Sequence, residues 1–190
     1  MSELFSIQLQ DQQQSSDGVW LDLPTTTEQV QAALRQIGIS SDNPQGLFIS
    51  GYFAEEEKRF AISYNMVLAS NVDELNFLAS RLETLSAGER AELNAALQAP
   101  QSELFSIGRI TDFPENVDYY VHLPDVHGPA QLGDYYLNRS GMVNMPEEWK
   151  GGIDTAQFGR YVAQQEQGAF TQYGYLVKSG DEWQKVHEGQ

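Results

Sequence analysis

The chain has 190 residues, of which 27 are Asp or Glu and 11 are Lys or Arg, so its formal net charge at pH 7 is −16. Such a charge repels phosphate backbones and anionic membranes, which excludes the usual nucleic-acid-binding and membrane-binding classes. Because 41% of the residues are hydrophobic, the chain can build a core, and the absence of cysteine excludes disulfides and thiolate metal sites. The sequence shows neither a signal peptide nor an apolar run of membrane-spanning length and therefore predicts a cytoplasmic protein.

The acidic residues are spread along the chain and do not form a tail. They divide almost evenly between the two halves, and the longest run, Glu55–Glu57, is followed at once by Lys58 and Arg59. Acidic tails carry five or six like charges in a row. The pattern predicts charge on folded elements, where it would attract a basic protein surface. Simple solubility is the alternative explanation of the same composition.

Two segments near the N-terminus predict a strand pair that recurs later in the chain. Ser2–Ile7 matches Ser102–Ile107, and at the same offset Trp20–Pro24 matches Tyr120–Pro124. Each copy indicates a strand, a polar excursion and a second strand that ends in Leu-Pro before a helix. Chance similarity between short β-patterned segments is the alternative explanation.

A helix and a further strand complete the first module. Thr25 and Glu28 form a capping box, and the helix is expected to end at Gly38. Residues 47–53 predict a strand in which Gly51 indicates a bulge or close packing, and residues 64–68 are expected to extend this strand region. The apolar face of the helix consists of Val30, Ala33, Leu34 and Ile37.

The middle of the chain predicts two amphipathic helices. Asn71 and Glu74 form a capping box at the start of the first helix, over residues 72–85, in which leucines recur at helical spacing. The second helix begins at Ser86 and ends at Pro100. In this second helix Leu93 and Leu97 are expected to face inward, and the side chains expected to remain in water are Glu89, Arg90 and Glu92.

The C-terminal part predicts two helices and a hairpin. Gly128-Pro129 starts the first helix, with Leu132, Tyr135 and Tyr136 on its apolar face. Asp154 caps the second helix, which runs through Phe158, Tyr161 and Val162 and is expected to end at Gly168. Residues 170–177 and 182–186 predict a hairpin with Gly180 at a turn position of positive φ.

These elements predict an α+β protein with three small domains. The N-terminal α/β module spans residues 1–68, the central helical module spans 69–101, and the C-terminal α/β module spans 102–190.

No motif of a known enzyme class is present. The sequence lacks a dinucleotide-binding glycine pattern, a phosphate-binding loop, a nucleophile elbow and a His-Glu-x-x-His pattern. His122, Asp125 and His127 could in principle hold a metal, but a proline turns the chain between them and solvated histidines are the favoured interpretation. We therefore predict a protein that is not an enzyme and has neither a metal site nor a cofactor. The tyrosine pairs at 119–120 and 135–136 are assigned to packing.

Three blocks of the sequence, in this order and spacing, resemble the ArdA family of antirestriction proteins. The blocks are Gly18–Pro24, Leu78–Leu85 and Phe158–Ala163 with Gly168–Tyr175. The resemblance implies an elongated, non-catalytic homodimer that evades host defence on behalf of mobile DNA. It also implies that the stretch from Leu82 to Gln98 corresponds to the antirestriction segment of the family.

The resemblance further implies a mechanism in which carboxylates imitate DNA phosphates. The implied partner is a type I restriction–modification enzyme, chiefly its methyltransferase and specificity subunits, and the implied result is that incoming DNA escapes restriction. Duplex DNA carries about one charge per 1.7 Å, so the carboxylates of one chain correspond to roughly 46 Å of duplex. A rigid mimic would also avoid the cost of bending real DNA, on the order of 1–6 kcal/mol.

The candidate contact residues are the acids expected to be exposed on the predicted helices and loops. They are Asp73, Glu74, Glu83, Glu89, Glu92, Asp112, Glu115, Asp118, Asp134, Glu147, Glu148 and Asp154.

Two alternative functions stay open from the sequence. An acidic interaction module could inhibit another basic protein, such as a CRISPR effector or a regulator. A hydrolase that uses paired carboxylates would require a deep pocket with convergent acids.

Overall fold

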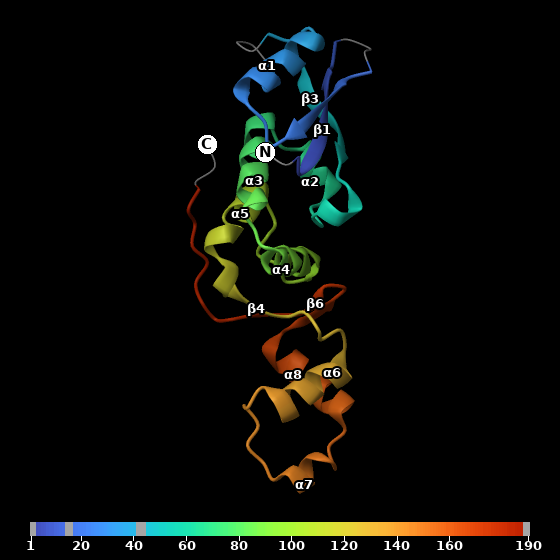
Figure 1. The fold of residues 1–190 in the computed structure, drawn as a ribbon, viewed down its shortest axis with the longest axis vertical. Helices are drawn as coiled ribbons and strands as arrows, with labels where there is room; N and C mark the ends of the chain where they lie inside the picture. Colours follow the sequence, from blue (N-terminus) through green and yellow to red (C-terminus); the bar gives the residue numbers. More distant parts are fainter. Residues whose placement is uncertain (1–2, 14–16, 41–44, 188–190) are drawn as a thin grey trace. The chain divides into compact units, whose positions relative to one another are not determined.

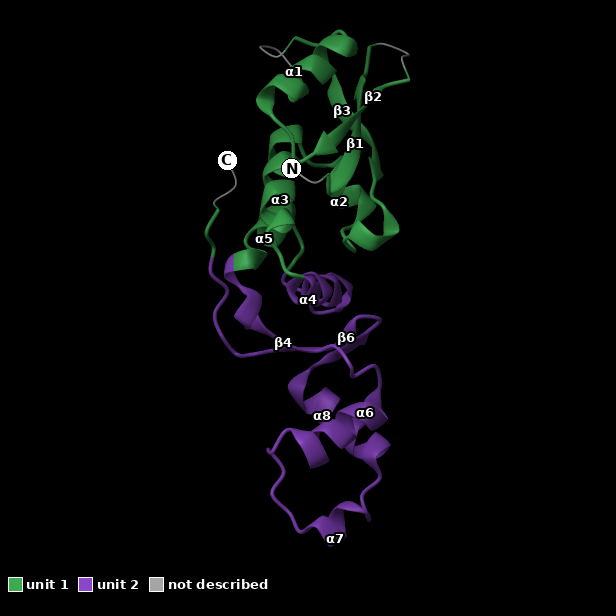
Figure 2. Ribbon diagram, in the orientation of Figure 1, with its two compact units in different colours: residues 1–86, 104–114, 185–190 green, residues 87–103, 115–184 purple. Residues whose placement is uncertain are grey.

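The computed structural model describes residues 3–13, 17–40 and 45–187, which form two compact units (Figures 1 and 2). Unit 1 contains residues 1–86, 104–114 and 185–190, and unit 2 contains residues 87–103 and 115–184. The predicted α+β class is confirmed, because the described residues form one three-stranded antiparallel sheet in each unit together with eight α-helices. The three-domain division stays a prediction. Ser2, the first residue of the predicted repeat, lies outside the described residues.

The sheet of unit 1 consists of β1 (Phe5–Asp11), β2 (Val19–Leu23) and β3 (Leu47–Phe53) in the order β2-β1-β3. These strands confirm the prediction, and their alternation places Ile7, Leu9, Leu21, Leu23 and Ile49 in the core. The register shifts where Gln8 faces Gly51 and Leu9 faces Ile49. The irregularity expected at Gly51 is therefore confirmed.

Helix α1 (Thr27–Gln36) begins one residue later than its predicted capping box requires. Thr26 is the N-cap, and its partner is Gln29 instead of Glu28. The reason is that Thr25 is engaged elsewhere: its amide donates to Asn76 Oδ1 at 2.7 Å and its carbonyl accepts from Asn76 Nδ2 at 3.0 Å. Gly38 follows the helix with φ +79°, as expected for a C-terminal glycine.

The remaining helices of unit 1 contact the sheet or one another. After the short turn η1 (Glu56–Lys58), α2 (Tyr64–Leu68) is a helix, so the predicted extension of the strand region is wrong. Helix α3 (Val72–Glu83) begins at Asn71, whose side chain accepts from the Glu74 amide at 2.8 Å, as predicted. Its buried leucines face inward, and α5 (Ile107–Thr111) packs against it.

The predicted strand at Ser102–Ile107 is wrong. Ser106 instead caps α5 by accepting from the Arg109 amide, and Ile107 and Ile110 are buried one helical turn apart. Spacing of three residues places both side chains on one face of a helix, which a strand does not do. The turn η2 (Phe113–Glu115) follows α5.

Unit 2 begins with α4 (Ala87–Gln98), which confirms the predicted second central helix. After the turn η3 (Val117–Tyr119), β4 (Tyr120–Leu123) confirms the predicted strand before the second Leu-Pro, and it pairs with β6 (Gly174–Lys178). The third strand, β5 (Ala169–Thr171), lies at the other edge, so the order is β4-β6-β5.

The helices that follow β4 confirm two predicted starts. Helix α6 (Pro129–Asp134) begins after Gly128 and continues into the π-helical turn η4 (Tyr135–Arg139), and α8 (Thr155–Glu166) is capped by Asp154. The short helix α7 (Glu147–Lys150) lies between them. Within α8, Tyr161 is 60% exposed.

Helices α6 and α8 approach each other at two glycines and lie side by side in Figure 1. A Cβ on Gly133 would lie 1.9 Å from the Thr155 carbonyl oxygen, and a Cβ on Gly159 would lie 1.8 Å from the Pro129 carbonyl oxygen. Only residues without a side chain permit this approach. The contact positions the buried cluster of Val126, Leu132, Ala163 and Tyr175.

The hairpin at the C-terminal end is displaced from its predicted position. Strands β5 and β6 form it, whereas residues 182–186 form no strand. The latter segment is held by other contacts: the Asn116 side chain bonds both the amide and the carbonyl of Gln184, and the Trp183 ring lies 5.1 Å from the Tyr119 ring. Gly180 has φ +100°, so its expected positive φ is confirmed.

Candidate functional site

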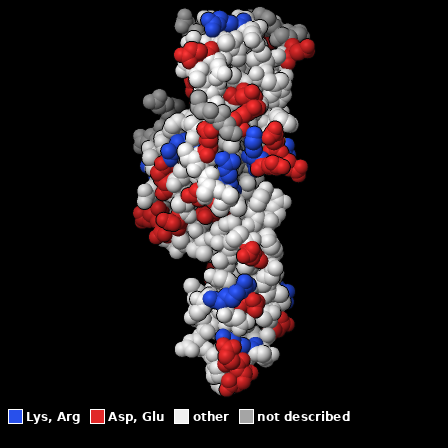
Figure 3. Space-filling view, in the orientation of Figure 1, with Lys and Arg blue, Asp and Glu red and all other residues white. Residues whose placement is uncertain are grey.

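Acidic side chains are accessible to water over both units. Among the acidic residues that the structure describes, Asp112 alone is buried. Figure 3 shows acidic residues in separate groups on the visible face, including one at the end of unit 2 that carries α7. The exposed candidates are Asp73, Glu115, Asp118, Glu147, Glu148 and Asp154, and the half-buried candidates are Glu74, Glu83, Glu89, Glu92 and Asp134.

Several candidates occupy the first turns of helices. Asp73 and Glu74 lie in the first turn of α3, and Glu147 and Glu148 lie in the first turn of α7. Asp154 caps α8 by accepting from the Gln157 amide at 3.0 Å. Carboxylates are favoured at these positions because the helix N-terminus carries unpaired amide donors and a partial positive charge. The N-termini of these helices therefore favour carboxylates at these positions.

Asp134 and Glu147 have basic neighbours in the same unit. Asp134 pairs with Arg139 at 3.3 Å and accepts from the Asn138 amide group at 2.9 Å, and Glu147 pairs with Lys150 at 2.6 Å. Exposed ion pairs contribute little stability and exchange readily with other partners. These contacts therefore leave both carboxylates accessible to a basic protein surface.

Glu92 was predicted to be exposed to water, and this prediction is wrong. Its side chain is half-buried, and its Oε1 atom is shielded from water without a hydrogen-bond partner. Burial raises the pKa of this carboxyl to about 8, and the nearby charges of Glu89 and Asp118 add to the shift. Glu92 is consequently mostly protonated at neutral pH and supplies little negative charge.

Asp112 was expected to be exposed and is instead 2% exposed in unit 1. Its Oδ1 atom accepts from the backbone amide of His187 at 2.9 Å and lies 2.8 Å from His187 Nδ1. The His187 ring also packs edge-on against Phe77. Asp112 therefore holds a distant segment of the chain in place and is not available for a partner.

Sequence reasoning missed other exposed acids. Glu55, Glu56 and Glu57 lie together around η1 in unit 1, and all three are exposed. The run of three is visible in the sequence but is not among the predicted contact residues. Glu28 in the first turn of α1 and Asp22 on β2 are exposed as well.

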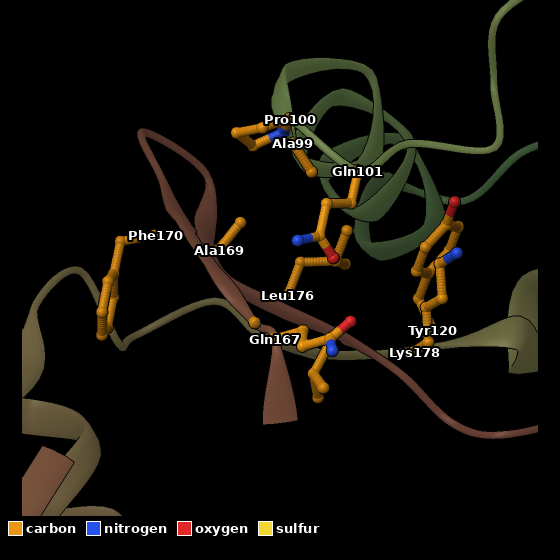
Figure 4. A pocket seen from close by; sticks show the side chains of 11 residues that line it. Ala99, Pro100, Gln101, Tyr120, Gln167, Ala169, Phe170, Leu176 and Lys178 are labelled. Atoms are coloured by element: carbon orange, nitrogen blue, oxygen red, sulfur yellow. The ribbon is translucent and has the colours of Figure 1, made fainter. Parts of the chain in front are cut away.

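The pocket that we find in unit 2 does not have the form of an active site. It measures about 200 Å³ and lies between the end of α4 and the β5–β6 hairpin, where Gln101 extends toward the strand that carries Leu176 (Figure 4). None of the described residues that line it is acidic. A carboxylate-based hydrolase would need convergent acids in a deep pocket, so this cavity does not support that alternative.

The described residues also bring together no group of three or more His, Asp or Glu side chains fit to hold a metal. His122, one of the three residues weighed for this role, instead has its Nε2 atom 2.7 Å from the Tyr173 carbonyl oxygen. Among the residues that the structure describes, no helix combines the length and the apolar character needed to cross a membrane.

Comparison with known families decides the identity. Residues 14–177 match the antirestriction protein family (ArdA). The chain belongs to this family. The resemblance seen in the sequence is thereby confirmed, and ArdA proteins are inhibitors of restriction and not enzymes. A comparison with curated proteins finds no match.

Proposed function

We propose that this ArdA protein occupies the DNA-binding channel of a type I restriction–modification enzyme and thereby protects incoming DNA from restriction. The channel is formed by the methyltransferase and specificity subunits, and the carboxylates of ArdA take the places of DNA phosphates. Family membership supports the antirestriction role. The accessibility of nearly all described acids supports the electrostatic mechanism, because only exposed charges can pair with the Lys and Arg side chains that hold DNA.

The proposed contact residues are the candidates that keep both exposure and charge. Asp112 is excluded because it is buried, and Glu92 because it is mostly protonated. The other ten remain proposed contacts: Asp73, Glu74, Glu83, Glu89, Glu115, Asp118, Asp134, Glu147, Glu148 and Asp154.

We also propose that the active form is a homodimer. If all were ionised, the 27 carboxylates of one chain would be equivalent in charge to roughly 46 Å of duplex, and a dimer would double that length. The net charge of −16 per chain requires that the dimer surface avoid the densest acidic regions.

Competition for DNA binding tests the mechanism. A purified type I methyltransferase with its specificity subunit is bound to a labelled duplex, and ArdA is added at increasing NaCl concentrations. We expect inhibition to weaken steeply with salt, because the screening length falls from about 10 Å at 0.1 M to about 3 Å at 1 M. Inhibition that does not change with salt would contradict the mechanism, and displacement of DNA only from an unrelated basic protein would reassign the target.

Charge-matched variants test the proposed contacts. Glu147→Gln, Glu148→Gln and Asp154→Asn together remove three candidate charges from unit 2. Asp17→Asn, Asp125→Asn and Glu182→Gln together remove three exposed charges outside the candidate set. The first triple variant should lose more inhibition than the second. Equal losses would mean that net charge, and not the placement of these acids, determines inhibition.

A further inference from the structure

One face of the unit 1 sheet presents aromatic side chains to water. Strand alternation places the apolar side chains of β1 and β2 in the core, so the intervening residues lie on the opposite face. Three aromatic residues on that face are exposed: Trp20 by 51%, Phe53 by 55% and Phe48 by 36%. Exposed aromatic patches of this kind mark interaction sites. The polar residues of the same face are Ser6, Gln8, Gln10 and Asp22.

The indole of Trp20 extends across the sheet. Trp20 on β2 pairs with Gln8 on β1, and Gln8 pairs with Gly51 on β3. The Cη2 atom of Trp20 lies 3.0 Å from the position that a Cβ on Gly51 would occupy. The ring therefore spans β1 and reaches β3, where the absence of a side chain makes room for it. This arrangement presents an aromatic surface supported from below by the backbone.

Two carboxylates border this aromatic surface and share one donor. Ser6 Oγ lies 2.8 Å from Asp22 Oδ1 and 3.4 Å from Glu3 Oε1. A hydroxyl has one proton and can donate to one carboxylate at a time. Asp22 and Trp20 are two residues apart on the same strand face, a separation of about 7 Å. A cationic donor placed here would pair with the carboxylates and contact the indole together.

We propose that this sheet face binds an arginine side chain of a basic partner protein. A guanidinium group stacks on an aromatic ring within about 6 Å and forms paired hydrogen bonds with a carboxylate, which matches the spacing of Trp20 and Asp22. Two cations that follow β3 in the same unit already have partners, since Lys58 pairs with Glu55 at 3.1 Å and Arg59 donates to the Ala54 carbonyl.

A nucleic acid is the other ligand that stacks on sheet aromatics. The carboxylates of Asp22 and Glu3 and the net charge of −16 oppose phosphate at this face and favour a protein cation. None of the acids proposed to imitate DNA lies on this sheet. The arginine-binding face is therefore a second interaction surface, independent of the proposed antirestriction function.

Titration of the full chain with short peptides tests this proposal. The probes are acetyl-Gly-Arg-Gly-Arg-Gly-amide and its lysine equivalent, and the signals are the indole N–H resonances of Trp20, Trp149 and Trp183. We expect the arginine peptide to shift the Trp20 resonance and to bind about fivefold more tightly than the lysine peptide. Trp20→Ala and Asp22→Asn should each weaken binding about fivefold.

Trp149→Ala is the matched control, because Trp149 is also exposed, by 67%, but lies in unit 2. Binding that is the same for wild type and Trp20→Ala, or a shift confined to Trp149 or Trp183, would overturn the proposal. A Trp20 shift with a single-stranded oligonucleotide but not with the peptide would overturn it in favour of a nucleic acid. Asp22→Asn changes an exposed polar group, so it keeps the test valid if Trp20→Ala folds poorly. The titration contains no restriction enzyme, and its outcome is therefore separate from that of the DNA competition.

Discussion

Replacing Glu92 by glutamine is expected to leave inhibition nearly unchanged at pH 7. With a pKa of about 8, roughly nine-tenths of the Glu92 carboxyls are protonated at that pH, so the replacement removes only about a tenth of a charge. Glu89→Gln on the same helix is the matched comparison, because Glu89 lies one turn away and is a proposed contact. In the DNA competition assay, Glu89→Gln should weaken inhibition more than Glu92→Gln.

The same replacement should change how stability depends on pH. The folded-state pKa of Glu92 lies above its ordinary value of 4.5, so between pH 4.5 and 8 the folded protein keeps a proton that the unfolded chain releases. The free energy of unfolding therefore contains a contribution that is complete below pH 4.5 and decreases as the pH rises to 8. When the free energy of unfolding is measured by urea denaturation, Glu92→Gln should no longer show this decrease between pH 4.5 and 8. A carbon-13 titration of the Glu92 carboxyl with a midpoint near 4.5 would refute the reasoning.

Three further predictions concern stability. Gly159→Ala should destabilise unit 2 by about 1–3 kcal/mol through overpacking, whereas Gly151→Ala, with no atom within 4 Å of its Cβ, should not; urea denaturation compares them. His187→Ala should cost about 1–2 kcal/mol, because the buried Asp112 carboxylate loses a hydrogen-bond partner; an unchanged melting temperature would contradict this role. Burial and the Glu166 carboxylate raise the pKa of Tyr136 and Tyr175, so both stay protonated in the folded state above pH 10 and stability decreases there as the pH rises. Glu166→Gln should shift their ionisation to lower pH in a near-ultraviolet absorbance titration, and an unshifted titration would refute that assignment.

Local signals predicted the starts of three helices correctly. Asn71 and Asp154 cap their helices as expected, and Gly128-Pro129 begins α6, because a cap depends on residues within one turn of it. Alternation of apolar residues likewise located β1 and β2.

The repeated hexapeptide shows where local signals fail. The first copy of Ser-Glu-Leu-Phe-Ser-Ile enters β1, which has partners on both sides, whereas the second copy leads into α5. The two copies differ in conformation because their tertiary contacts differ. Phe5 and Ile7 pair with Leu23 and Leu21 on a neighbouring strand, whereas Ile107 lies on a helix that packs against α3.

The exposure of individual acidic side chains could not be predicted from the sequence either. The buried Asp112 accepts a hydrogen bond from His187, which lies 75 residues away, and burial raises the pKa of Glu92. Both were predicted to be exposed from their place on a polar helix face or loop. Such burial depends on distant contacts, which neither charge patterning nor periodicity reveals.

The interleaving of the two units limits how the chain can be divided. Unit 1 takes residues from three separate stretches, the last of which follows all of unit 2 in sequence. A fragment that stops after residue 101 would lack α5, which packs against α3, and His187, whose ring packs against Phe77. Genetic dissection of this protein is therefore better done with point replacements or with circularly permuted chains than with simple deletions from either end.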